Sequence, residues 1–143
     1  MGCDIHFFSE VKLADGQWYC YGSPDLSRNY ALFGKMAGVR CPANIMPIAE
    51  PRGLPDDCSV VVRWASDDYG EDGHSHSYLT ASEIAELEDW WREKYKDAPG
   101  MRAHFPEIEW GYLNGNSWGG FMRWPSEAPD GLMDVRFVFW FDN

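Results

Sequence analysis

The sequence predicts an α+β fold, in which an antiparallel sheet from an N-terminal hairpin and C-terminal strands is covered by one main helix. Apolar and polar residues alternate over 3–13 and again over 135–141, which is typical of strands with two different faces. A capping-box pattern at residues 80–83 opens a stretch with helical apolar spacing. No repeat, low-complexity segment or linker interrupts the chain, so we expect a single domain over residues 1–143.

The N-terminal hairpin is predicted from alternation and one turn. Cys3, Ile5 and Phe7 should point to one face of the first strand, and the polar residues between them to the other. Ala14-Asp15-Gly16 is a turn in which glycine supplies the positive φ, and residues 17–21 return as the second strand.

A short helix and an irregular segment should follow. Asn29 can cap a helix over 30–37, and Gly38 is a natural end for it. Four prolines make residues 42–57 irregular. Residues 58–65 are ambiguous, because their valine run favours a strand whereas Asp56 or Asp57 as an N-cap favours a helix, which we prefer.

The second half should hold the main helix and the remaining strands. After a polar loop at 66–77, Thr80 and Glu83 open a helix over about 81–97, which Pro99-Gly100 ends. Its apolar stripe consists of Ile84, Leu87, Trp91 and Tyr95. Strands are expected over 107–113 and 121–124 around a glycine-rich loop at 114–120, before the strong last strand.

Composition limits the function classes. A formal charge of −11 excludes a protein that grips nucleic acid over a broad face, since such proteins need a basic surface. It allows a soluble enzyme with a local site, a cation binder, or an acidic protein that docks onto a basic partner. The four cysteines lack C-x-x-C spacing, and no apolar run approaches the ~20 residues that span a bilayer. We therefore expect a cytoplasmic protein with reduced thiols and no membrane contact.

Two histidine-containing motifs suggest a metal or phosphate site. Asp4-Ile5-His6 has two polar residues on one strand face, and His74-Ser75-His76 can present both imidazoles to one point. Imidazole with carboxylate suits a divalent metal such as zinc or manganese, and Asp72 could act as a base or orient an imidazole. The alternative is that these histidines only cap and hydrogen-bond, as we expect of His104. A nucleophilic triad from Ser75, Ser77 or Cys3 is disfavoured, because adjacent residues rarely reach the required geometry.

Other residues could bind an anion or a base. Arg28 and Arg52 lie in loops, where arginine often clamps an anionic ligand, although the Arg52-Gly53-Leu54-Pro55 segment is more typical of a simple turn. Trp118 in the glycine-rich loop could stack on a base, or could instead fold back onto the core, which we favour.

Asp4-x-His6 and Gly73-His74-Ser75-His76 resemble the first and last metal motifs of calcineurin-like phosphoesterases. That resemblance implies divalent-metal chemistry on phosphoesters. The intervening Gly-Asp and Gly-Asn-His motifs of that family are missing here, and the chain is too short for its double-sheet fold.

A second resemblance covers about the first 80 residues. The segments Cys3-Asp4-Ile5-His6, Arg28-Asn29-Tyr30, Arg52-Gly53-Leu54-Pro55 and Gly73-His74-Ser75-His76-Ser77 are similar to a family of short phage and prophage proteins that open with a Met-Gly-Cys-Asp-Ile-His-like stretch. It implies a viral or mobile-element context, with the cytoplasm of the host cell as the location, and no particular chemistry.

Two functional hypotheses follow. In the first, the protein is a metal-dependent phosphoester- or nucleotide-acting enzyme, with Asp4, His6, His74 and His76 as ligands, Asp72, His74 and His76 in catalysis, and Arg28 or Arg52 binding the anion. In the second, it is a non-enzymatic inhibitor that binds a host defence protein or sequesters a small nucleotide. A structural or assembly protein whose histidines merely cap is the third option.

Overall fold

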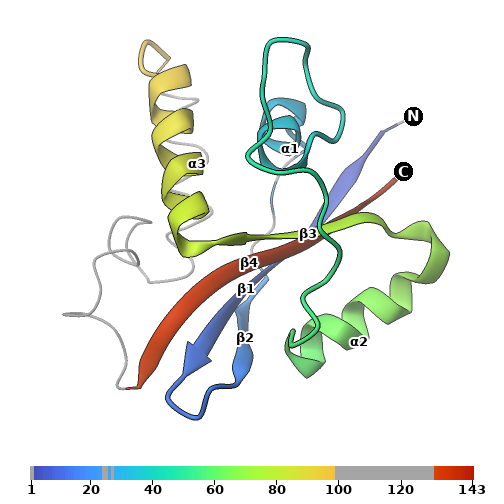
Figure 1. The fold of residues 1–143 in the computed structure, drawn as a ribbon. Coiled ribbons are helices and arrows are strands. Elements are labelled where there is room, and N and C mark those ends of the chain that lie inside the picture. Colours follow the sequence, from blue (N-terminus) through green and yellow to red (C-terminus); the bar gives the residue numbers. More distant parts are fainter. Residues whose placement is uncertain (1, 24–25, 27, 99–130) are drawn as a thin grey trace.

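The computed structural model describes residues 2–23, 26, 28–98 and 131–143, and it confirms the α+β fold (Figure 1). The strands β1 (Asp4–Leu13), β2 (Trp18–Gly22), β3 (His74–Thr80) and β4 (Leu132–Asp142) form one antiparallel sheet in the order β2-β1-β4-β3. The N-terminal hairpin and the C-terminal strand therefore lie side by side in the sheet, as predicted. Gly16 makes the hairpin turn with φ +80°, and its N–H donates to the carbonyl of Leu13 (2.9 Å).

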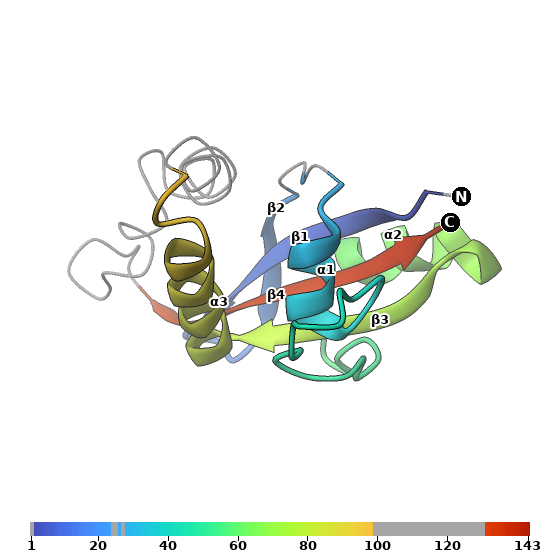
Figure 2. The same cartoon turned by 90° about the horizontal axis from the view of Figure 1, so that it is seen from above.

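Both faces of the sheet are covered, because β4 is buried on both sides from Val135 to Phe141. On one face, the phenylalanines of β4 pack against α1 (Tyr30–Ala37) and α3 (Ala81–Lys94). On the other, Val138 and Trp140 pack beneath α2 (Val60–Tyr69). Figures 1 and 2 show this arrangement, with α1 and α3 on one side of the sheet and α2 on the other.

Local capping chemistry sets the ends of α1 and α3. The Asn29 side chain accepts from the N–H of Leu32 (3.0 Å), and Gly38 ends α1 in the left-handed conformation (φ 73°). Both bonds of the predicted capping box form between Thr80 and Glu83. The prediction that this helix reaches residue 97 was wrong: it ends at Lys94, because Tyr95 leaves the helical conformation (φ −110°, ψ 24°) with its ring against Trp91.

The ambiguous segment is a helix, but it begins later than expected. Its N-cap is Ser59, whose Oγ accepts from the N–H of Val62 (3.4 Å), rather than Asp56 or Asp57. Of the three valines only Val62 is buried. The run that resembled a strand is therefore one helical turn with a single inward residue.

The polar segment 66–77 is not a loop throughout. It completes α2, forms a short 3₁₀ helix (Gly70–Asp72) and then enters β3. β3 escaped prediction because its first half is polar, and its extended conformation depends on pairing with β4. Within the described ranges, no helix has the length and apolar character needed to cross a bilayer. The strands expected at 107–113 and 121–124, the loop with Trp118, and His104 lie outside the described residues.

Candidate functional site

The two histidine motifs come to the same end of the sheet. In the β1–β4 register, Asp4 lies opposite Asp142 and His6 opposite Trp140. In the β3–β4 register, His74 lies opposite Phe141. The N-terminal ends of β1 and β3 therefore flank the C-terminal end of β4, and we call the residues Asp4, His6, His74, Ser75 and Asp142 the polar end.

His6 is held by a carboxylate and an aromatic ring. Its Nε2 lies 2.9 Å from Oδ2 of Asp142, and the two side chains are 21% and 27% exposed. From α2, the ring of Tyr69 packs 3.9 Å from the imidazole. A carboxylate on one ring nitrogen fixes the orientation of the imidazole, so that the other nitrogen is left for a proton or a ligand.

A β-bulge separates the environments of His74 and His76. The register shifts between His74 and Ser77, and Ser75 has a positive φ of +55°. The ring of His76 lies over Trp140 (5.5 Å) and that of His74 beside Phe141 (6.3 Å). These aromatic residues belong to opposite faces of the sheet. A regular strand would place both imidazoles on one face, and the extra residue prevents this.

The two imidazoles also differ in hydrogen bonding. Nε2 of His76 lies 3.0 Å from the Ser66 hydroxyl of α2. Burial first, and a charge on His74 second, lower the pKa of His76. Nδ1 of His74 lies 3.0 Å from the Ser75 hydroxyl, whereas its Nε2 is buried with no hydrogen-bond partner among the described residues. A buried imidazole nitrogen without a partner costs free energy, which a ligand could recover.

Backbone strain is concentrated at the same end. Within the described ranges, the non-glycine residues with positive φ are Ser75 and Arg40 (φ 51°). Nη2 of Arg40 lies 3.4 Å from Oδ1 of Asn143, directly after β4. Strained residues cluster at binding and catalytic sites more often than elsewhere, which favours a ligand here.

The other predicted residues of this site have different partners. Asp4 accepts two hydrogen bonds from the Arg28 guanidinium, each of 2.9 Å, and both side chains are about half exposed. Asp72 is exposed at the end of the 3₁₀ helix. In the part of the chain that the structure describes, no three His, Cys, Asp or Glu side chains are grouped closely enough to hold a metal ion.

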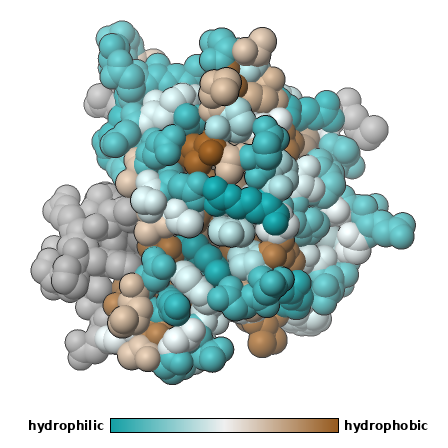
Figure 3. Space-filling view, in the orientation of Figure 1, coloured by the Kyte–Doolittle hydropathy of each residue, from teal (hydrophilic) through white to brown (hydrophobic). Residues whose placement is uncertain are grey.

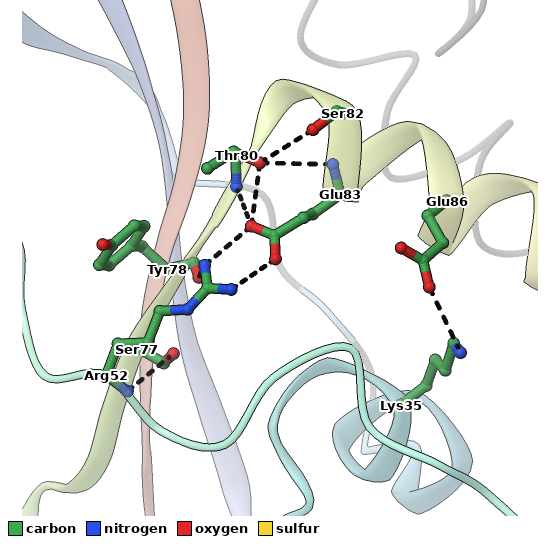
Figure 4. Close-up of polar contacts among 8 residues, drawn as sticks. All are labelled: Lys35, Arg52, Ser77, Tyr78, Thr80, Ser82, Glu83 and Glu86. Carbon is green, nitrogen blue, oxygen red and sulfur yellow. Dashed lines mark hydrogen bonds and ion pairs between the residues drawn. The ribbon is translucent and has the colours of Figure 1, made fainter.

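The guanidinium of Arg52 lies at the start of α3, as Figure 4 shows. It donates to both carboxylate oxygens of Glu83 and to the carbonyl of Tyr78, while the Arg52 backbone N–H donates to the Ser77 hydroxyl. The Arg52 guanidinium, which we proposed as an anion clamp, thus connects the loop that carries Arg52 to the junction of β3 and α3. Trp118, the other residue predicted to bind a ligand, is outside the described residues.

The Arg52–Glu83 pair makes a pH-dependent contribution to stability. The Arg52 hydrogen bonds, followed by those from Thr80, lower the pKa of Glu83 from 4.5 to about 2. A carboxylate with a depressed pKa stabilises the fold above its unfolded pKa, and this contribution is lost as the pH falls towards 2. Urea unfolding of the wild type and Glu83→Gln should therefore show a stability gap that narrows between pH 5 and pH 2.5.

The matched control is Glu86→Gln on the same helix. Its carboxylate is 58% exposed and lies 3.9 Å from the Lys35 ammonium, so this variant should follow the wild-type curve. A gap for Glu83→Gln that stays constant with pH would contradict the ion pair.

A buried ion pair on the α2 face was missed from the sequence. Glu10 is fully buried; its carboxylate accepts from Nε of Arg136 (2.7 Å) and from the backbone N–H of Ser59 (2.6 Å). Nη1 of Arg136 donates to Asp57 (2.9 Å), which lowers the pKa of that carboxyl, and the guanidinium lies 3.9 Å from the Trp18 ring. The signal in the sequence that could have found this pair is a charged residue at a core-facing position of each strand, Glu10 in β1 and Arg136 in β4. The pair joins the start of α2 to the sheet.

No protein-family model matches the chain, and no curated protein or solved structure matches it significantly. The geometry of the described residues is therefore the basis for a functional proposal.

Proposed function

We propose that the polar end binds the phosphate group of a small phosphoester or nucleotide and that the protein hydrolyses it. The observation that carries this proposal is the contact between His6 and Asp142 (2.9 Å) beside Asp4, at the end of the sheet where β1 and β3 flank β4. The unpartnered Nε2 of His74 and the positive φ of Ser75 support a ligand at this place.

His6 and Asp142 would supply the base. With Nε2 bonded to Asp142, the other nitrogen of His6 can take the proton of an attacking water. The phosphorus–oxygen bond to the leaving group then breaks, and the leaving oxygen takes a proton from solvent. Arg28 would leave Asp4 and bind the phosphate instead. Breaking the Arg28–Asp4 ion pair costs little free energy, because both side chains are about half exposed.

A divalent metal, zinc or manganese, would add Lewis-acid activation at the same end. It would have to take several ligands from water and from the phosphate itself, because no group of three ligating side chains exists among the described residues. Asp4 and His6 are the side chains that we expect to contribute, whereas His74 lies beside Phe141 on the other face of the sheet. His76 is held under α2 by Ser66 and would act only indirectly.

Replacing His6 by alanine should lower kcat/KM for phosphoester hydrolysis about 100-fold or more, since general-base catalysis contributes on that scale. Phosphate release from p-nitrophenyl phosphate, bis(p-nitrophenyl) phosphate and nucleoside monophosphates measures this, with EDTA, zinc or manganese added. Asp142→Asn should show a smaller loss with an altered pH profile. Asp97→Asn, which changes an exposed carboxylate after α3, is the control. Equal rates for wild type and His6→Ala on every substrate would end the proposal.

A second candidate is sequestration without turnover, in which the same end holds a nucleotide signal as part of a non-enzymatic anti-defence role. The buried, unpartnered nitrogen of His74 favours tight binding equally well. Calorimetry with nucleotides distinguishes the two: sequestration predicts saturable 1:1 binding with unchanged ligand after hours. Metal analysis of protein purified without an oligohistidine tag tests the metal separately.

A further inference from the structure

Large apolar side chains are exposed at the start of α2. Val60 is 85% exposed, Val61 50% and Trp64 74%, all within the first five residues of the helix. Figure 3 shows apolar surface at the lower edge of the view, over the start of α2. Single exposed apolar residues are ordinary, but an exposed tryptophan beside two exposed valines is a patch that needs a partner.

This patch contributes nothing to covering the sheet. The underside of α2 uses Val62 and Ser66, which are buried against the sheet, and Tyr69, which packs on His6. The patch projects from the opposite side of the same helix. Folding therefore does not explain why a tryptophan stands at position 64.

The charge beside the patch indicates what kind of partner fits it. Asp67 and Asp68 at the end of α2, and Glu71 and Asp72 in the following 3₁₀ helix, are all exposed. The guanidinium of Arg63 is directed to the carbonyl of Pro55 (3.1 Å). With a net charge of −11, two copies of this chain would repel each other, whereas a lysine- and arginine-rich surface would be attracted.

We infer that the outer face of α2 docks onto a basic region of another protein, with Trp64 as the anchor in an apolar pocket and the neighbouring carboxylates pairing with cations around it. Tryptophan is among the residues that carry most of the binding energy at interfaces, and charged groups at the rim set the rate and the choice of partner. This role is independent of hydrolysis at the polar end.

The helix is well held for such a role. At its start, Ser59 donates to the buried Glu10 carboxylate; further along, Ser66 bonds His76 and Tyr69 packs on His6. A helix fixed at both ends loses little conformational freedom on binding, which favours affinity.

Site-specific photocrosslinking tests the surface in the full chain. A benzoylphenylalanine at position 60 should, on irradiation in cells that express the protein, form a covalent adduct with a partner of basic isoelectric point. The same group at Met46, which is 79% exposed in the irregular segment after α1, is the matched control and should not form this adduct. An adduct between two copies of the chain, or the same adduct from both positions, would overturn the inference, as would no adduct at position 60.

The purified partner then gives the affinity. Trp64→Ser should weaken 1:1 binding about 30-fold, the loss typical of an interface hot spot. Asp67→Asn with Asp68→Asn should slow association and reduce its dependence on salt. Met133→Ser, another exposed apolar residue (67%), should bind as the wild type does. The wild type and the three variants should unfold at similar temperatures, since none of the substitutions reaches the core. Unchanged affinity of Trp64→Ser for the partner would refute the role of Trp64 as the anchor.

Discussion

Replacing Glu10 by glutamine is expected to lower the free energy of unfolding by about 3 kcal/mol, because it removes one charge of a buried pair and leaves the other. Glu10 is fully buried and Arg136 is 7% exposed, so water cannot replace the lost partner easily. Asp57 still pairs with Arg136, which places the loss at the lower end of the range for broken buried pairs. Urea unfolding at pH 7 measures the change.

Two further variants test whether the loss comes from the unpaired charge. Glu93→Gln, in the exposed Lys96–Glu93 pair, should change stability by less than about 0.5 kcal/mol. Glu10→Leu combined with Arg136→Leu should be more stable than Glu10→Gln alone, since no charge is then left buried without its main partner. If the double variant is less stable than Glu10→Gln, packing rather than charge explains the effect.

Trp140→Ala should cost about 3–5 kcal/mol, the range for truncating a buried aromatic residue. Trp140 is fully buried, and its ring contacts His6 on one neighbouring strand and His76 on the other (5.9 and 5.5 Å between ring centroids). Its loss would open a cavity beneath α2 and release both imidazoles. Thermal and urea unfolding measure the cost.

Trp140→Phe gives a sharper comparison. The indole Nε1 is buried without a hydrogen-bond partner among the described residues, so phenylalanine removes an unsatisfied donor while it loses some volume. The net cost should be below about 1.5 kcal/mol. Trp64→Ala on the outer face of α2 should change stability by less than about 0.5 kcal/mol. A loss under 1 kcal/mol for Trp140→Ala would contradict the packing of α2 on the sheet.

Features set by neighbouring residues could be predicted from the sequence. The Thr80–Glu83 capping box, the Asn29 cap with Gly38, and the turn at Gly16 each depend on a few adjacent residues, and each formed where expected. The alternation in β1 and β4 also shows directly in the sequence, because every second side chain faces the same layer.

Features set by strand pairing could not be predicted from the sequence. The first half of β3 is polar, and the partner that makes it a strand lies on β4, far away in the sequence. The residue with positive φ in the bulge is Ser75 rather than a glycine, so the sequence does not indicate a bulge there. It therefore could not be predicted that His74 and His76 lie on opposite faces of the sheet. The sequence suggested that Asp4-His6 and His74-His76 lie close together, but it did not indicate Asp142 or Ser66 as their neighbours, since each comes from another element.

The pairing of Asp4 with Asp142 has a practical consequence for handling the protein. Residues 2 and 143 lie close together beside the polar end, as the labels N and C in Figure 1 show. A purification tag or fusion partner at either end would begin within a few residues of His6. An oligohistidine tag would add metal-binding imidazoles at that very place, so attachment in the exposed hairpin turn at residues 14–17 is the safer choice.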